Sequence, residues 1–435
     1  MFALSLDDYS WNVHSLLAQN QTADSLAYRQ SWKFIFLLEM IKTLSSNCDA
    51  TKEIKEASRC LERIFGSPIP GIFDLVKSKI LSLSKLKLPH GSIGIEGADN
   101  IELDAGEVAF EDVCDNDELK RKLCSNIEGL TRYLERAVDS IISPSYRIYI
   151  CFDRVDEAWD VASQEVSVKV ITGLIAAADS LNQKFKKLVR PIVFLREDIF
   201  ETLPLNDKNK LREDCGSLLK WDKEGLQNLL LKRINYFAKR NGISDVTNID
   251  ALFDREVMRQ KMRPTGYILK RTMYRPRDII CFVSKIISAL NDQQNDPFND
   301  YEEVKDKLLV SAIYDAEYQY SEWLLEEIKE EWFVQAPEIN QLLDAIQNNG
   351  STIIVKHEYK IQLEKLGFDL SQPLHLNEKL KFLYGNSIIG FKIGGQNYWR
   401  YKCFYNSQGF SDESEYHIHD GLVKALNLVE TRAVQ

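Results

Sequence analysis

The stretch "RIYICFDRVDEAWD" (147–160) places three carboxylates directly behind a run of mostly apolar residues. Asp153 follows the run at once, and Asp156 and Glu157 come shortly after it. Such a run predicts a buried strand. Because Mg²⁺ takes one or two carboxylates together with phosphate oxygens and water, Asp153 is a candidate ligand, and Asp156 or Glu157 can polarise a water against a γ-phosphate. A strand that ends in a solvated acidic turn explains this stretch equally well.

A second apolar run, "VRPIVFLRED" (189–198), ends in a cation, Arg196. The carboxyl ends of parallel strands meet at one edge of a sheet, which is where α/β proteins bind ligands. Arg196 is therefore a candidate to sense a γ-phosphate near Asp153. Taken alone, an ion pair of Arg196 with Asp153 or Glu197 is the simpler interpretation.

The stretch "MYRPRDIICF" carries Arg275 and Arg277 on either side of a proline, just before a predicted helix. Arginines at the start of a lid helix can reach the phosphates of a bound nucleotide. Surface arginines around a proline at a helix start are the simpler interpretation of these residues by themselves.

Strand and helix patterns alternate from residue 1 to about 240. "MFALSL", "YRIYICFD", "VRPIVFLRED" and "GSLLKWD" are the apolar runs, and helical periodicity separates them. This alternation predicts an α/β layer with a largely parallel sheet. Residues 88–118 are rich in glycine and acids and are expected to form an exposed loop or hairpin.

The second half of the chain is predicted to be helical and to close on a hairpin. Residues 247–300 have helical patterns, and "SEWLLEEIKEEW" continues as a long acidic helix. The tail "NEKLKFLYGNSIIGFKIGGQNYWRYKCFY" indicates a helix followed by a hairpin that turns at Gly394 and Gly395. Helices that close on a hairpin predict a winged-helix-like α+β domain.

Two features of the tail offer other chemistry. His417 and His419 share one strand face before Asp420, but without a third ligand a helix capped by Asp420 is favoured over a metal site. Residues 351–405 hold more lysine and arginine than acid, and "NYWRYKCFY" alternates aromatic and basic residues. This region is a candidate nucleic-acid face, although a packed wing strand explains the alternation as well.

Composition restricts the class of protein. The 435 residues are 44% hydrophobic and 28% charged, which is typical of a globular protein. The net charge of −10 argues against coating nucleic acid by bulk charge. Eight scattered cysteines without zinc spacing fit reduced thiols in the cytoplasm. We expect no signal peptide and no membrane span, because the chain has neither a basic leader nor a run of about 18 apolar residues.

In this order, "IYICFDRVDEAWD", "VRPIVFLREDIFETL", "LLKWDKEGLQNLLLKRI" and "YRPRDIICFVSKI" resemble a bacterial family of P-loop ATPases of the STAND/AAA+ type, related to NACHT-like enzymes. The resemblance covers roughly residues 1–300. It implies ATP and Mg²⁺ as cofactors, Asp153 as the metal ligand and Asp156 and Glu157 as the catalytic pair.

The resemblance also assigns the arginines. Arg196 matches a sensor arginine, and Arg275 and Arg277 match a basic pair that opens a lid helix. Members of the family act in host defence or signalling, which comes to this chain by analogy.

The implied fold is α/β, with a P-loop NTPase-like parallel sheet that lacks its first strand and phosphate loop, then a helical lid and a winged-helix-like domain. The corresponding domains are 1–245 (NTPase-like), 246–300 (lid), 301–332 (linker helix) and 333–435 (winged-helix-like). A protein partner or a homo-oligomer is also expected.

The phosphate loop GxxxxGK[ST] is absent from this chain. In the family its strand lies between those represented by "PIVFLR" and "GSLLKW". Three explanations remain open: a truncated chain, a segment or partner that supplies the loop, or a decayed site. The function hypotheses are accordingly a nucleotide-dependent ATPase switch, active if the loop is supplied, and a non-hydrolysing scaffold or DNA-binding protein of ATPase-like shape.

Overall fold

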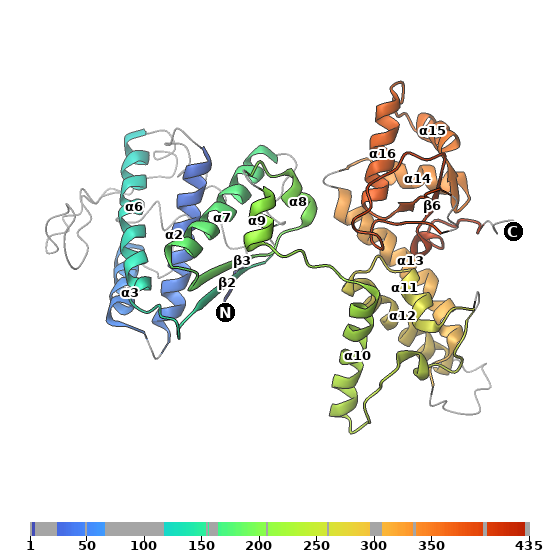
Figure 1. The fold of residues 1–435 in the computed structure, drawn as a ribbon, viewed down its shortest axis with the longest axis horizontal. Coiled ribbons are helices and arrows are strands. Elements are labelled where there is room, and N and C mark those ends of the chain that lie inside the picture. Colours follow the sequence, from blue (N-terminus) through green and yellow to red (C-terminus); the bar gives the residue numbers. More distant parts are fainter. Residues whose placement is uncertain are drawn as a thin grey trace. The chain divides into compact units, whose positions relative to one another are not determined.

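The chain forms two compact units, Met1–Leu218 and Leu219–Gln435, in a computed structural model (Figure 1). The structure describes residues 2–4, 24–47, 50–65, 117–153, 155, 164–205, 208–258, 261–295, 307–333, 336–394 and 398–430. The predicted loop at 88–118 therefore lies almost entirely outside the described residues. The boundary between the units falls earlier than the predicted domain boundary at 245.

A small parallel sheet forms the centre of the first unit. It consists of β1 (Phe2–Leu4), β2 (Ile148–Phe152) and β3 (Val189–Val193), in the order β1-β2-β3. Each of these strands was predicted from an apolar run. The central strand β2 pairs in parallel with both neighbours. The first unit is thus a mixed α/β structure with few strands and many helices.

Two helices, α2 (Asp24–Ser45) and α7 (Gln164–Lys184), cover one face of this sheet (Figure 1). Two more, α3 (Lys52–Phe65) and α6 (Asp117–Asp139), pack on α2. Trp32 and Phe36 of α2 pack their rings against Phe152 of β2, and the Trp32 indole donates a 2.9 Å bond to the Val170 carbonyl of α7. One buried helix therefore holds both a neighbouring helix and the central strand.

The opposite face of β2 and β3 is partly open. Side chains alternate between the two faces of a sheet along each strand. Tyr149 on β2 and Ile192 on β3 therefore point away from α2 and α7, and Phe194, two residues after Ile192, lies on the same side as Ile192. Their exposed fractions are 37%, 38% and 43%. Apolar side chains at this level of exposure, on a parallel strand, indicate a face that the described residues leave partly uncovered.

The run "GSLLKWD" is not a strand, contrary to the prediction. Residues 216–222 are irregular and exposed, with Leu219 at 73%. They follow two short helices, α8 (Glu197–Thr202) and α9 (Lys208–Cys215). A strand forms where a neighbour pairs with its backbone, and no described strand lies on the outer side of β3.

Helices dominate the first half of the second unit: α10 (Lys223–Arg240), the 3₁₀ turn η3 (Ile249–Leu252), α11 (Pro264–Lys270), α12 (Pro276–Asn295) and α13 (Val310–Phe333). This agrees with the helical pattern predicted after residue 247. Asp222 caps α10 by accepting a 2.7 Å bond from the Gly225 amide, and Gly242 beyond its end has a φ of +69°, a conformation that favours glycine after a helix.

The second half of this unit is a compact α+β module. Its elements are α14 (Ile339–Asn349), β4 (Ile353–Val355), α15 (Lys356–Lys365), α16 (Pro373–Gly385), β5 (Ile389–Gly390) and β6 (Glu415–Ile418). The strands are antiparallel in the order β4-β6-β5. The predicted helices are present, and Phe391 and Arg400 form an antiparallel bridge across the predicted hairpin turn, of which Gly394 is described and residues 395–397 are not.

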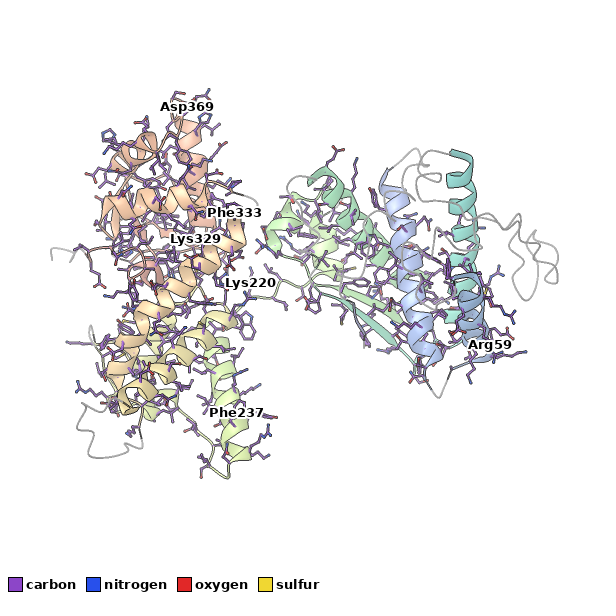
Figure 2. All side chains as sticks on the ribbon, turned by 180° about the vertical axis from the view of Figure 1, so that it is seen from behind. Arg59, Lys220, Phe237, Lys329, Phe333 and Asp369 are labelled. Carbon is purple, nitrogen blue, oxygen red and sulfur yellow. The ribbon has the colours of Figure 1, made fainter. Side chains whose placement is uncertain are left out.

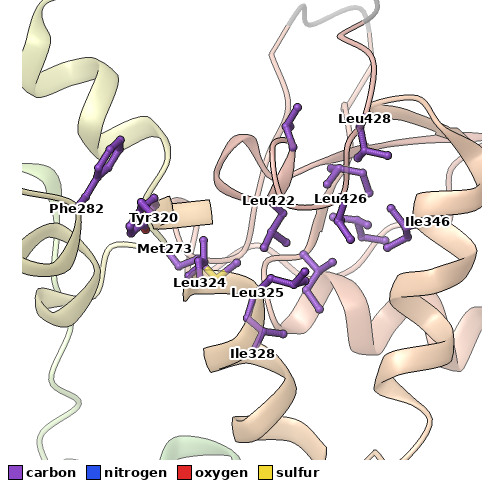
Figure 3. Close-up of a cluster of buried hydrophobic side chains, with 14 of the residues drawn as sticks. Met273, Phe282, Tyr320, Leu324, Leu325, Ile328, Ile346, Leu422, Leu426 and Leu428 are labelled. Atoms are coloured by element: carbon purple, nitrogen blue, oxygen red, sulfur yellow. The ribbon is translucent and has the colours of Figure 1, made fainter. Parts of the chain in front are cut away.

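One hydrophobic core joins the two halves of the second unit (Figure 3). Phe282 of α12 stacks on Tyr320 of α13 with ring centroids 4.3 Å apart. Further along α13, Leu324 packs beside Leu422 and Leu426 of the C-terminal tail. The predicted linker helix is therefore a core element, which explains why α13 is buried over much of its length.

Candidate functional site

The carboxyl edge of the parallel sheet brings together two of the predicted site segments. Phe152 at the end of β2 lies opposite Val193 of β3, and the Phe194 amide donates a 2.8 Å bond to the Phe152 carbonyl. Leu4 of β1 lies opposite Phe152 on the other side. The residues that follow β2 and β3 therefore leave the sheet at the same edge, which is where parallel sheets bind ligands.

Asp153 is the first residue beyond the central strand. Its side chain is exposed, whereas Phe152 before it and Val155 after it are buried. The buried neighbours on both sides hold the backbone of Asp153 in place, while its carboxylate remains accessible to solvent. Asp156 and Glu157 lie outside the described residues, so their catalytic role stays a prediction.

Arg196 stands between β3 and α8, beyond the same edge. Its guanidinium donates two bonds to the Asp198 carboxylate, from Nε at 3.1 Å and from Nη2 at 3.0 Å. Both side chains are about one-third exposed or less. The sequence raised Asp153 and Glu197 as partners and missed Asp198, although an acid in the first turn of a helix is a common signal. This two-pronged bond fixes the arginine near the strand end.

A groove of about 600 Å³ runs beside β3. It lies between β3, α7, α8 and α9, and continues along residues 216–218. Tyr149, Ile192, Leu195, Phe200 and Leu211 contribute apolar lining. Among the described residues β3 is the last strand of its sheet, so its outer backbone edge borders this groove.

Arg275 and Arg277 belong to the second unit and bind carboxylates there. Arg275 donates to Asp278 from Nε at 3.1 Å and to Glu331 of α13 from Nη1 at 2.7 Å. Arg277 donates to Glu327 of α13 at 2.7 Å. Burial raises the pKa of Asp278, and the charge of Arg275 opposes that rise. These bonds tie the start of α12 to α13, and the simpler interpretation of surface arginines around a proline did not predict these partners.

The two C-terminal histidines are held by protein groups. Nδ1 of His419 accepts a 3.1 Å bond from the Gly421 amide and so caps the 3₁₀ turn η5 (Asp420–Leu422). The cap was predicted at Asp420, which instead pairs with Lys270 at 3.0 Å. His417 lies 2.7 Å from the Tyr401 hydroxyl. Within the described ranges no group of three or more His, Cys, Asp or Glu residues is arranged to hold a metal ion.

The basic residues of the predicted nucleic-acid face mostly bind groups of their own module. Lys356 pairs with Asp412, and Lys360 pairs with Glu364. The Lys392 ammonium lies 4.2 Å from the centre of the Trp399 ring. The described "NYWRYKCFY" side chains are similarly engaged, and Trp399 stacks on the ring of His417 at 5.2 Å. This face therefore has fewer available cations than the sequence indicates.

In the part of the chain that the structure describes, no helix combines the length and the apolar character that crossing a membrane requires.

Comparisons with known proteins match parts of the chain. Residues 224–329 match the model of the FunZ-associated C-terminal helical domain. A putative transposon gamma-delta 80.3 kDa protein of Escherichia coli K12 is 30% identical over 172 residues. That match covers 38% of this chain and 24% of the relative, so the chain spans about a quarter of the length of this relative. No solved structure matches the chain significantly. The chain is thus similar to a transposon-associated protein over part of its length, and its helices from α10 to α13 are similar to a FunZ-associated domain.

Proposed function

We propose that the carboxyl edge of the β1-β2-β3 sheet binds a magnesium–nucleoside triphosphate, as part of an ATPase-type switch. The observation that carries this proposal is the parallel register of β2 and β3. It directs Asp153 and the segment leading to Arg196 out of one sheet edge, so a carboxylate and a cation flank the place where ligands bind in open α/β sheets.

The residues at this edge suit a magnesium ion that also binds phosphate. Asp153 offers one exposed hard oxygen ligand, and Mg²⁺ commonly takes a single carboxylate when phosphate oxygens and waters complete its shell. The ion would neutralise phosphate charge. Arg196, already oriented by Asp198, would be the cation that faces a phosphate oxygen.

Hydrolysis requires a phosphate loop, and the proposal assigns its place to the groove beside β3. The family resemblance puts the loop-bearing strand next to the strand that here is β3. Among the described residues no strand pairs with the outer edge of β3, and this edge, the groove and the irregular course of 216–222 support a place for the loop-bearing strand there. With the loop supplied, Asp156 or Glu157 would orient the attacking water.

The experiment is calorimetric titration of the full chain with Mg-ATP. We expect weak binding, with a Kd of about 1 mM, because the loop that supplies most nucleotide affinity is absent. Asp153→Asn should weaken binding about tenfold, a loss of about 1.4 kcal/mol. Asp139→Asn is the matched control, because Asp139 is an exposed carboxylate at the end of α6, before the chain enters the amino end of β2.

A second titration adds a synthetic peptide that carries a strand followed by GxxxxGK[ST]. Tighter Mg-ATP binding with the peptide, lost in Asp153→Asn, supports a site completed by another segment. If the chain binds no Mg-ATP with or without the peptide, the alternative gains: a non-hydrolysing scaffold that keeps an ATPase-like shape.

A further inference from the structure

The outer face of α10 gathers four cations around one aromatic ring. Tyr236 has Lys232 and Arg233 one turn before it and Lys239 and Arg240 one turn after it. Residues three and four apart lie on the same side of a helix. All five side chains are exposed.

This face is not part of the hydrophobic core. Leu226, Leu230 and Ala238 are the buried residues of α10, and they lie on its inner side. Tyr236 is 59% exposed and its neighbour Phe237 is 51% exposed, and their rings meet edge to face at 5.3 Å. Figure 2 labels Phe237 on this helix. Two adjacent rings are therefore presented to solvent on a helix that buries its aliphatic residues.

The cations of this face carry no compensating acids. The sequence from 225 to 240 contains no Asp or Glu, although the chain as a whole has a net charge of −10. None of the ion pairs found among the described residues involves Lys232, Arg233, Lys239 or Arg240. Arg240 instead lies over the Tyr236 ring, with its guanidinium carbon 5.6 Å from the ring centre. Lys356 and Lys360 of the C-terminal module, by comparison, are both in ion pairs with acids. The cations of α10 are therefore more available to bind a polyanion.

We propose that this face of α10 binds single-stranded nucleic acid. Its four cations would contact backbone phosphates, and Tyr236 and Phe237 would stack on unpaired bases. Basic residues that follow the backbone, with exposed rings between them, are the combination that sequence-tolerant single-strand binding uses. An anionic membrane matches this face less well, because a helix that lies on a membrane inserts an extended apolar face. The exposed apolar groups on α10 are the two aromatic rings, and Ile243 just beyond its end is the exposed aliphatic residue nearby.

The test is fluorescence anisotropy of the full chain with a labelled oligothymidylate of about 20 nucleotides, beginning at about 50 mM NaCl. Four phosphate contacts predict a slope of log K against log salt of about −3, from about 0.7 per contact on a single strand. Replacing Lys232, Arg233, Lys239 and Arg240 by Gln should abolish binding and the salt slope. The matched control replaces Lys356, Lys360, Lys392 and Arg400 by Gln, which removes the same charge, and should change affinity less than about threefold.

Stacking is tested separately from charge. Tyr236→Ala should weaken oligothymidylate binding about tenfold, whereas Tyr236→Phe, which keeps the ring, should stay within about twofold. A duplex of the same length should bind more weakly than the single strand.

Three results would overturn the proposal: no oligothymidylate binding at about 50 mM salt, equal loss in the control variant, or full affinity in Tyr236→Ala. Binding to vesicles of anionic lipid without binding to the oligonucleotide would assign the face to membranes instead. Because these readouts contain no nucleoside triphosphate, their failure is independent of the function proposed for the sheet edge.

Discussion

Arg271 and Glu317 form a buried ion pair in which Nε of the arginine lies 2.7 Å from Oε1 of the glutamate. The Tyr267 hydroxyl donates a 2.7 Å bond to the other carboxylate oxygen. Both charged side chains are less than a tenth exposed. Since Arg271 follows α11 and Glu317 lies on α13, this pair is a polar contact within an otherwise hydrophobic interface.

Removing one partner of this pair is expected to destabilise the second unit strongly. Glu317→Ala leaves the Arg271 charge buried and unpaired, which costs about 3–5 kcal/mol. Replacing both residues together, as Arg271→Met with Glu317→Leu, should recover most of that loss because no charge remains buried. Urea unfolding measures the free energies. Arg277→Ala, which breaks an exposed pair with Glu327, is the control and should cost less than about 1 kcal/mol.

Arg275→Ala tests a residue that the sequence placed near phosphate. Its guanidinium binds Asp278, which is fully buried, and Glu331. Losing these bonds leaves the Asp278 carboxylate without its cation, and a loss of about 2 kcal/mol is expected in urea unfolding. Arg275→Lys should retain part of the stability. A variant that keeps full stability would contradict the anchoring role seen in the structure.

Acid is expected to weaken the second unit through His419. Burial lowers the pKa of this imidazole from 6.5 to about 4, with Lys270 and Arg271 also opposing its charge and Asp420 favouring it. Well above pH 6.5 the ring is neutral in both the folded and the unfolded state, and it does not change the stability. Between pH 6.5 and 4 the unfolded chain binds the proton and the folded chain does not, so stability falls as pH falls, by about 1 kcal/mol at about pH 5.5.

The check is urea unfolding of wild type and His419→Gln over that pH range. The variant should lose this part of the pH dependence, since glutamine does not titrate. Identical pH profiles for wild type and His419→Gln would rule out the buried imidazole as the source.

Replacing each of two helical glycines in the first unit by alanine should change the stability in opposite directions. A Cβ on Gly173 of α7 would lie 2.4 Å from Cβ of Tyr28 on α2, so Gly173→Ala must push the helices apart. We expect a loss of about 2–3 kcal/mol. A Cβ on Gly129 of α6 would meet none of the described neighbours within 4 Å, so Gly129→Ala should gain about 0.5–1 kcal/mol from helix propensity. Thermal unfolding distinguishes the two.

Local patterns were sufficient to predict the three strands of the parallel sheet and the positions of Asp153 and Arg196 after two of them. The apolar run before Asp153 and the one before Arg196 are both strands, and they are parallel neighbours. Gly242 ends α10 as its left-handed φ requires. These features depend on a few consecutive residues, so the sequence specifies them directly.

Features that depend on distant partners could not be predicted. "GSLLKWD" has the composition of a strand but remains irregular, because strand formation also needs a neighbour. The Arg275 bond to Glu331 joins two helices that no local pattern connects. Aromatic and basic alternation drew attention to "NYWRYKCFY", where Trp399 packs on His417, whereas the adjacent rings of Tyr236 and Phe237 on α10 are more than half exposed. Alternation in sequence does not distinguish a ring that packs internally from one that faces solvent.

The order of the sheet has a consequence for synthesis on the ribosome. Phe2 of β1 pairs with Ile150 of β2, and the register continues to Pro191 of β3. The first strand leaves the ribosome roughly seven to thirty seconds before its partner does, at about 5–20 residues per second. Until then its backbone groups are open to other polypeptides. Nascent chains that carry this strand should accordingly depend on chaperones more than the small size of the sheet would suggest.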